Sequence, residues 1–336
     1  MKPPILGIVV PCYNEHEVLP ETAKRLAELL ARLVQSGDVS ELSAVWFVDD
    51  GSRDDTWAII LGLAEQPDSV FRGIKLSRNR GHQAALLAGL MRAEGDVLIS
   101  IDADLQDDLE AMPKMIAAKA AGCDIVYGVR SSRAIDTPFK RITAEAYYVL
   151  LRKLGVDLVF NHADYRLMSR RAVESLRQFP ESNLFLRGLI PQLGYRSGQV
   201  EYVRLERYAG SSKYPLGKML ALAWQGVTSF STAPLRVITV LGIAVSLMSL
   251  GLGTWALLIR LTTNDVVPGW ASTVVPLFLL SGVQLLSLGM IGEYIAKIFV
   301  EAKRRPLYFV ESEAGATGRT TLPSERRSHT TVNGAQ

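Results

Sequence analysis

Residues 97–110 read VLISIDADLQDDLE, an apolar run that gives way abruptly to acidic side chains. Other short runs rich in apolar and β-branched residues also read as strands, and helical patterns such as 19–34 and 54–64 lie between them. These further runs cover residues 5–11, 44–49, 70–76 and 125–129. The alternation predicts an α/β fold, a mostly parallel sheet covered by helices on both faces. Ligands bind at the carboxyl ends of strands in such sheets, so the polar residues that follow each run are candidate site residues.

The composition excludes several protein classes. The 336 residues allow about two domains, and 37 Lys and Arg nearly balance 34 Asp and Glu for a formal charge of +3. This balance does not suggest a nucleic-acid partner. Cys12 and Cys123 are too few for a disulfide framework, a single bridge between them has little support, and a reducing compartment fits best.

Apolar residues, 48% of the chain, are concentrated near the C-terminus. Residues 237–259 and 266–292 contain no charged side chain, and each run exceeds the roughly 20 residues that a helix needs to cross a membrane. We expect two membrane spans, at about 235–259 and 268–292, in a multi-pass protein. A pair of buried core helices is the weaker alternative.

Charges at the ends of the expected hairpin predict its orientation. The connector between the spans carries Arg260, balanced by Asp265. Basic residues beyond the outer ends are Arg236, Lys297, Lys303, Arg304 and Arg305. The positive-inside bias therefore puts residues 1–236 and both termini in the cytoplasm, at the cytoplasmic (inner) membrane. The N-terminal apolar run, 5–10, is too short for a signal peptide.

Four segments are expected along the chain. Residues 1–213 form the α/β domain, and 214–231 carry apolar residues at helical intervals, typical of an amphipathic helix at the membrane surface or, alternatively, of a core-packed helix. Residues 232–300 form the transmembrane hairpin. Residues 301–336 form a largely disordered cytoplasmic tail, because the sequence after Val310 is rich in Ser, Thr, Gly, Glu and Arg without periodicity.

Acidic residues follow two of the predicted strands. Asp102 and Asp104 lie two apart, so on an extended segment they point the same way and repel each other unless a cation lies between them. A hard divalent ion, Mg²⁺ or Mn²⁺, takes oxygen ligands and can neutralise a diphosphate leaving group. A solvated turn is the alternative. Asp49 and Asp50 end another strand, where they could accept hydrogen bonds from a base or ribose.

Three motifs, in their order and spacing, resemble glycosyltransferase family 2, whose catalytic domain has the GT-A fold. They are IVVPCYNE at 8–15, VDDGSRDDT at 48–56 and IDADLQDDLE at 101–110. Later stretches resemble the branch that makes polyisoprenyl-phosphate sugars, which includes dolichyl-phosphate mannose synthase and bacterial undecaprenyl-phosphate glucosyltransferases. These stretches are GHQAALLAGL at 81–90, ADYRLMSRRAVESL at 163–176 and RYAGSSKY at 207–214. The resemblance covers about residues 5–305.

The resemblance implies roles for individual residues at the donor site. The nucleotide would be held by Pro11, Tyr13, Glu15 and Asp50, with Asp49 nearby. The metal would be held by Asp102, Asp104 and Gln106, and Ala103 would line the sugar-nucleotide pocket. Arg207 and Lys213 would clamp the diphosphate, which suits cations on a flexible Gly-Ser segment. A juxtamembrane basic patch that meets anionic lipid is the alternative for these two.

The acceptor would be a lipid phosphate. Arg130 and Arg141 match basic positions that bind it in the family, with Arg133 and Lys140 as weaker candidates. Asp164 lies where related inverting enzymes have a catalytic base or a sugar contact. A base is dispensable, however, because a phosphate monoester is already largely ionised at pH 7.

One departure from the family pattern concerns the loop at 77–82, where Arg80 replaces an expected aromatic residue and puts the local contacts in doubt. His82 is expected to be a structural residue that opens a helix. The other histidines, His16, His162 and His329, do not have metal-ligand spacing.

The sequence therefore predicts a metal-dependent inverting hexosyltransferase that moves one sugar from a nucleotide sugar, best UDP-glucose, to undecaprenyl phosphate. A GDP-mannose-dependent polyprenyl-phosphate mannose synthase stays open, and so does a homo-oligomer. A processive polysaccharide synthase is disfavoured because the chain has no Arg-Trp pair and few spans. A non-catalytic lipid translocator with a nucleotide-sensing domain is the rival from another class, although the predicted spans carry no charge that would mark a translocation path.

Overall fold

The computed structural model describes residues 2–131, 162–179, 186–203, 233–262 and 269–315. Its centre is an eight-stranded sheet in the order β7-β5-β6-β4-β1-β2-β3-β8. The strands are β1 (Leu6–Cys12), β2 (Ala44–Asp49), β3 (Phe71–Leu76), β4 (Val97–Ser100), β5 (Ile125–Arg130), β6 (His162–Ser169), β7 (Ser197–Tyr202) and β8 (Val310–Ala314). Only β6 and β8 run antiparallel to their neighbours in this sheet. The predicted mostly parallel α/β class is confirmed.

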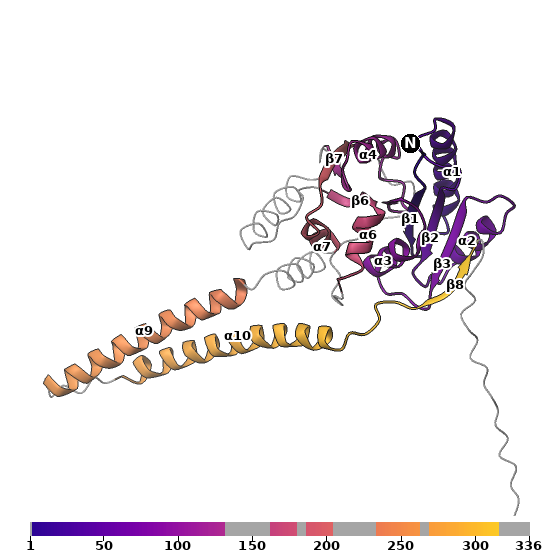
Figure 1. Cartoon of the computed structure of the whole chain (residues 1–336). Coiled ribbons are helices and arrows are strands. Elements are labelled where there is room, and N and C mark those ends of the chain that lie inside the picture. The colour runs from indigo at the N-terminus through magenta and orange to yellow at the C-terminus, as the bar shows by residue number, and fades with distance from the viewer. Residues whose placement is uncertain (1, 132–161, 180–185, 204–232, 263–268, 316–336) are drawn as a thin grey trace, which may run out of the picture.

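Helices cover both faces of the sheet (Figure 1). One face packs against α1 (Leu19–Gln35), α2 (Thr56–Ala64) and α4 (Ala111–Ala120). The other packs against α3 (His82–Arg92), α6 (Arg170–Leu176) and α7 (Leu186–Gln192). Every residue of the central strand β1 is buried, because both of its faces are covered.

Close packing holds α3 against the centre of the sheet. Gly89 on α3 lies so near Val9 on β1 that a Cβ at this glycine would come within 2.3 Å of the valine Cγ1. A larger residue at this position would push α3 away from the sheet. The first residue of α3, His82, is thereby held at the sheet edge where the candidate site lies.

The chain returns to the sheet after its last helix. β8 pairs antiparallel with the edge strand β3, with Ile74 opposite Glu313 and Lys75 opposite Ser312. The prediction of a disordered tail is therefore wrong for Val310–Ala314. The charged segment VESEA has no strong local preference for a strand, and it is ordered by backbone hydrogen bonds to an edge that lies more than 200 residues away in sequence. Residues 316–336 lie outside the described part.

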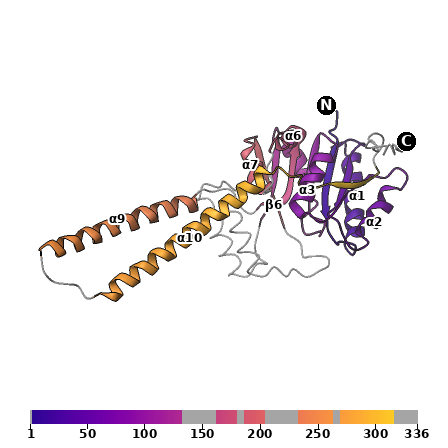
Figure 2. The same ribbon diagram turned by 90° about the horizontal axis from the view of Figure 1, so that it is seen from below.

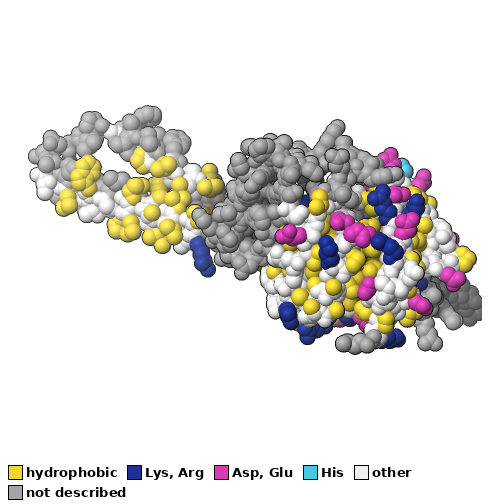
Figure 3. All heavy atoms as spheres, turned by 90° about the horizontal axis from the view of Figure 1, so that it is seen from above, with side chains coloured by type: hydrophobic (Ala, Val, Ile, Leu, Met, Phe, Trp, Pro, Cys, Tyr) yellow, Lys and Arg dark blue, Asp and Glu magenta, His cyan; other side chains and the backbone are white. Residues whose placement is uncertain are grey.

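Two long helices, α9 (Ala233–Thr262) and α10 (Trp270–Ala302), contact each other and are antiparallel. The chain leads away from the sheet domain along α9 and returns along α10 (Figures 1 and 2). On the face seen in Figure 3, patches of hydrophobic side chains lie along the described part of these helices, whereas charged side chains gather on the sheet domain. Their exposed large apolar residues include Val237, Val240, Ile243, Leu247, Leu250, Leu285, Leu288, Ile295 and Ile298.

Membrane-spanning capacity differs between these helices. Of the described segments, one, Leu279–Ala302, is long and apolar enough to cross a membrane by length and composition, and Leu235–Val245 is a shorter apolar helix. This segment ends ten residues beyond the predicted second span of 268–292. The predicted amphipathic helix at 214–231 lies outside the described residues.

Candidate functional site

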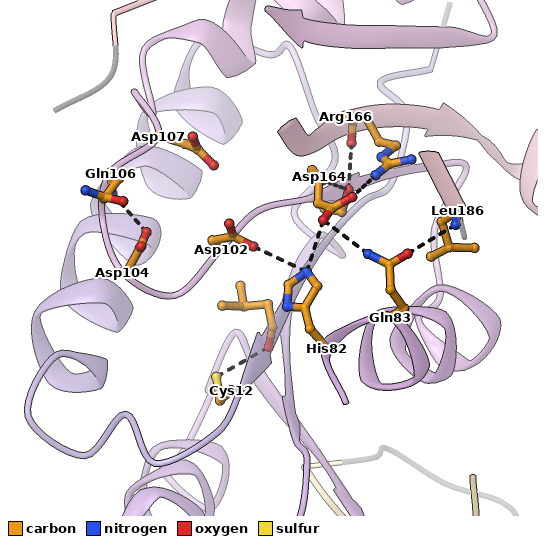
Figure 4. A network of polar contacts seen from close by, with 12 residues as sticks. Cys12, His82, Gln83, Asp102, Asp104, Gln106, Asp107, Asp164, Arg166 and Leu186 are labelled. Carbon is orange, nitrogen blue, oxygen red and sulfur yellow. Dashed lines mark hydrogen bonds and ion pairs between the residues drawn. The ribbon is translucent and has the colours of Figure 1, made fainter. Parts of the chain in front are cut away.

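The candidate site lies at the carboxyl ends of β1, β2 and β4, where three side chains from distant segments meet. In the β4–β6 register Ser100 pairs with Arg166, so Asp102 and Asp164 come opposite each other two residues further along. His82, the first residue of α3, extends its ring between them (Figure 4). Its Nε2 lies 3.5 Å from Asp102 Oδ1 and 3.4 Å from Asp164 Oδ2.

Asp164 is surrounded by hydrogen-bond donors. Its carboxylate accepts a hydrogen bond from Gln83 Nε2 at 3.2 Å, from Arg187 Nη2 at 3.1 Å and from the buried Arg166. Burial alone would raise the pKa of this carboxyl, but His82, Arg166 and Arg187 together hold its pKa well below the usual range. A carboxylate held in this way is a poor proton acceptor at neutral pH.

His82 combines two opposing influences. Burial lowers the pKa of its imidazole, but the contact with Asp164 and the negative charge of Asp102 outweigh burial and raise the pKa overall. His82 opens α3, as expected from the sequence. Its position between two carboxylates was not predicted.

The three predicted metal ligands share one loop, although its shape differs from the expectation. The segment after β4 turns at Ala103 and Asp104, and Leu105 has a φ of 57°, so the prediction of an extended segment with parallel carboxylates is wrong. Asp102 is directed at His82, whereas Asp104 Oδ1 accepts a hydrogen bond from the Gln106 backbone N–H at 3.2 Å (Figure 4).

The oxygen atoms of this loop fit a divalent cation. Among the described residues no three His, Cys, Asp or Glu side chains are grouped closely enough to hold a metal ion by themselves. Asp102 Oδ1, however, is buried and accepts no hydrogen bond within the described part of the chain. Burial and the charges of Asp164 and Asp104 raise the pKa of Asp102, against the opposing effect of His82. A cation bound here would offset the repulsion between these carboxylates, and substrate oxygens would complete its coordination.

The predicted nucleotide residues lie at the ends of β1 and β2. Tyr13 is 40% exposed, whereas Pro11 is buried at the end of β1. Both oxygens of Asp50 accept backbone hydrogen bonds, from Arg80 at 2.7 Å and from Gly81 at 2.8 Å. Asp50 therefore shapes the loop that leads into α3.

The other predicted donor-site residues are buried or half-buried. Asp49 is fully buried and accepts a hydrogen bond from the Ser52 backbone N–H at 3.2 Å. Ala103 is 4% exposed, and Glu15 is half-buried and donates its backbone N–H to Thr56 at 2.8 Å. A cavity of about 290 Å³ opens at Tyr13 and Ser52, on the loops that follow β1 and β2.

Arg130 ends β5, and its guanidinium is held in place by a tyrosine and a buried carboxylate. Its Nε donates to the Tyr202 hydroxyl at 3.3 Å, and its Nη2 lies 3.9 Å from Asp107 Oδ1. The Tyr202 hydroxyl donates to the same Asp107 oxygen at 2.5 Å. Burial and the charge of Asp102 raise the pKa of Asp107 to about 6.

Several predicted residues lie outside the described part of the chain: Arg133, Lys140, Arg141, Arg207, Lys213 and His329. Conversely, Gln83, Arg166 and Arg187 contact Asp164 but were not singled out in the sequence. Arg187 carries no motif signal at all. Gln83 and Arg166 fall inside the motifs quoted above. Each is a polar residue in a largely apolar stretch, and this could have marked it as a candidate.

Comparisons with known proteins identify the family of the chain. Residues 7–177 match the family Glycosyl transferase family 2. A Bacillus subtilis protein named uncharacterized glycosyltransferase YkoT is 48% identical over 310 residues, 92% of this chain and 91% of that protein. The bactoprenol glucosyl transferase of Shigella phage SfV is 41% identical over 309 residues, 92% of this chain and 98% of that protein. The Mycobacterium tuberculosis glucosyl-3-phosphoglycerate synthase, solved with Mn²⁺, UDP and phosphoglyceric acid, is 19% identical with a TM-score of 0.45 over 67% of this chain and 76% of that chain.

Proposed function

We propose, from the premise that the chain belongs to glycosyltransferase family 2, that it transfers glucose from UDP-glucose to undecaprenyl phosphate at the cytoplasmic membrane face. The observation that carries the proposal is the convergence of Asp102, His82 and Asp164 at the carboxyl edge of a mostly parallel sheet. The relative from Shigella phage SfV, named a bactoprenol glucosyl transferase, supports both the sugar and the acceptor class.

The chemistry is a single displacement. A phosphate oxygen of the lipid attacks C1 of the glucose, a new C1–O bond forms, and the bond from C1 to the β-phosphate oxygen breaks. UDP leaves with the bonding electron pair, and the configuration at C1 inverts. The attacking oxygen is already ionised near pH 7, so no proton has to be removed and correct orientation supplies much of the rate.

A divalent cation, Mg²⁺ or Mn²⁺, would be held by Asp102, Asp104 and Gln106 together with the diphosphate. When bound, it neutralises the charge that develops on the leaving UDP. Asp102 contributes a buried oxygen that accepts no hydrogen bond among the described residues, and the loop that carries Asp104 and Gln106 sets the remaining ligands.

Asp164 would position groups rather than accept a proton. Its low pKa and its contacts with Arg166 and Arg187 keep it ionised over the working pH range. An ionised carboxylate in contact with both His82 and Arg187 would hold these two side chains in position beside the reacting diphosphate.

Arg130 and Arg141 would bind the lipid phosphate, whereas Arg207 and Lys213 would bind the sugar nucleotide. We expect Arg130→Ala to raise the KM for undecaprenyl phosphate, or lower kcat, by roughly 10- to 100-fold, the usual loss when a hydrogen bond to a charged group is removed. Binding of UDP-glucose, measured by calorimetry without acceptor, should stay close to wild type. Arg207→Ala should do the reverse.

Arg177 provides a matched control for these arginine variants. It is exposed at the end of α6 and pairs with Glu174, so Arg177→Ala should change neither parameter. If Arg130→Ala abolished UDP-glucose binding, or Arg207→Ala left both binding and turnover untouched, the assignment of these cations would be wrong.

The return of the chain to the sheet supports a membrane hairpin. β8 follows α10 and pairs with β3, so both outer ends of the α9–α10 pair must lie on the same side of a membrane. A crossing by Leu279–Ala302 then requires a second crossing, and we assign it to α9. The charges at Lys303, Arg304 and Arg305 favour the cytoplasm for that side.

Cysteine labelling tests this topology. In a background with Cys12 and Cys123 replaced by Ser, a membrane-impermeant maleimide should label Thr263→Cys in intact cells. Arg305→Cys, at an exposed position beyond α10, should react only after the cells are opened. The reverse pattern would contradict the proposed orientation, and labelling of both positions in intact cells would contradict an inner-side anchor.

The donor is tested with purified full-length protein, undecaprenyl phosphate and a panel of radiolabelled nucleotide sugars. We expect label in the lipid fraction with UDP-glucose. A preference for GDP-mannose would make the protein a polyprenyl-phosphate mannose synthase. Absence of transfer from every donor would favour the non-catalytic alternative.

A further inference from the structure

The cavity at the ends of β1, β2 and β3 is completed by a residue from the far end of the chain. Tyr13, Ser52 and Arg78 line it from the loops that follow β1, β2 and β3, and Lys75 lines it from β3 itself. Glu311 comes from β8, after the two long helices (Figure 1). The wall therefore joins residues from both sides of the proposed membrane hairpin.

The sheet fixes Glu311 in position. Lys75 lies opposite Ser312 in the β3–β8 register, and the Ser77 backbone N–H donates to the Phe309 carbonyl at 2.9 Å. Further along β8, Glu313 forms an ion pair with Arg92 on α3. The carboxylate at 311 is thus carried by an ordered strand.

Lys75 and Glu311 set a donor beside an acceptor on the cavity wall. The Lys75 Nζ lies 3.2 Å from Glu311 Oε1. The Glu311 side chain is 50% exposed, and an ion pair so open to water contributes little to stability. A role in holding the fold together therefore explains this pair poorly, whereas recognition of a polar ligand uses both of its groups.

The distance from the proposed cation loop to the cavity suits a nucleoside diphosphate. The loop with Asp102 follows β4, and the cavity lies beyond β1 at the ends of β2 and β3. Three strand spacings of about 4.8 Å separate β4 from β3, roughly 14 Å in total, comparable with an extended nucleoside diphosphate. With its diphosphate near Asp102, the nucleotide would reach the cavity with its base.

We propose that Glu311 and Lys75 recognise the nucleobase and select uracil, an inference that rests on the proposed function. The Glu311 carboxylate accepts the ring N–H of uracil, and the Lys75 ammonium donates to the neighbouring carbonyl oxygen. Cytosine in the same position would turn a ring nitrogen lone pair toward the Glu311 carboxylate and an amino N–H toward the Lys75 ammonium, and both contacts are repulsive. Glu311 is a specificity-determining residue for the donor.

Calorimetry on the full-length protein in detergent tests this assignment, with Mn²⁺ and either UDP or CDP as the probe. Wild type should bind UDP more tightly than CDP. Glu311→Ala should weaken UDP binding roughly 10- to 100-fold and bring the UDP to CDP ratio close to one. Lys75→Met, which removes the ammonium and keeps an aliphatic side chain of similar length, should also reduce the ratio.

Glu313→Ala is the matched control, because Glu313 lies two residues further on the same strand and pairs with Arg92 outside the cavity lining. It should leave both affinities unchanged, which a purely structural role of β8 would not predict. Unchanged UDP affinity and an unchanged ratio in Glu311→Ala would overturn the inference.

Two further outcomes separate this inference from the proposed function. A wild-type preference for GDP that Glu311→Ala removes would keep the role of Glu311 and overturn the choice of uracil, since guanine also presents a ring N–H beside a carbonyl. Failure of the wild type to bind any nucleoside diphosphate would overturn the proposed function together with this inference.

Discussion

Replacing Asp104 with Asn should reduce glucosyl transfer by more than about 100-fold, equivalent to about 2.7 kcal/mol of lost transition-state stabilisation. The substitution removes one negative charge from the oxygen ligands proposed for the cation, while the amide oxygen can still accept the hydrogen bond from the Gln106 backbone N–H. Steady-state turnover at saturating UDP-glucose and undecaprenyl phosphate measures the loss.

Asp108 offers a matched control on the same loop. Its Oδ1 accepts a hydrogen bond from the Glu110 backbone N–H at 3.0 Å, a contact that Asn can also make, so Asp108→Asn should keep turnover within about threefold.

Excess chelator should abolish the activity of the wild type, and added Mn²⁺ or Mg²⁺ should restore it. Undiminished turnover in excess chelator would contradict the cation site.

Asp164→Asn should lower the free energy of unfolding by about 3–5 kcal/mol, the usual cost when one partner of a buried ion pair is removed. Arg166 is only 1% exposed, and Asp164 is the carboxylate with which it pairs. Without this partner a buried guanidinium loses its compensating charge. Proteolysis at increasing urea concentration measures the stability of the sheet domain.

Glu174→Gln is the control for this second substitution. Glu174 pairs with Arg177 at the surface, where the two side chains are 48% and 50% exposed, so the expected loss is below about 1 kcal/mol. Equal, small losses in both variants would show that the Asp164–Arg166 pair does not stabilise the fold.

The stabilisation from Asp164 should depend on pH in a defined direction. Because the fold lowers the pKa of this carboxyl, its contribution is present above the unfolded pKa of about 4 and is lost as the pH falls through the folded value. The difference in the free energy of unfolding between wild type and Asp164→Asn should therefore stay constant from pH 8 to pH 5 and become smaller below about pH 4. The ratio of glucosyl transfer by Asp164→Asn to transfer by wild type should be the same at every pH from 6 to 9. If Asp164 were a general base, this ratio would change with pH.

Local pattern was sufficient to predict the parallel half of the fold. The strand at 44–49 was predicted with its observed bounds, and the bounds of the strands at 5–11 and 97–101 differ from the structure by one residue. These strands are buried on both faces, so their sequences are almost continuously apolar. The predicted helix at 19–34 likewise matches α1 to within one residue because its apolar positions recur at helical spacing.

The unpredicted strands depend on partners that lie far away in sequence. β6 contains Asp164 and Arg166, two charged residues that are buried because they pair with each other, and a hydrophobic pattern cannot reveal such a strand. β8 is a charged edge strand that exists because β3 offers unpaired backbone groups.

The candidate site could be predicted only in part. Asp102 could be identified because it follows a buried strand. Its proximity to His82 and Asp164 depends on the β4–β6 register and on the position of α3, which no local motif encodes.

The most direct test of the central claim is transfer of radiolabelled glucose from UDP-glucose to undecaprenyl phosphate by the purified full-length protein with Mn²⁺. We predict stoichiometric release of UDP and label in a lipid that mild acid cleaves to free glucose, with a rate of labelling more than about 100-fold lower for Asp104→Asn. Binding of UDP-glucose without any lipid-linked label, under conditions in which both substrates are soluble and intact, would contradict the account.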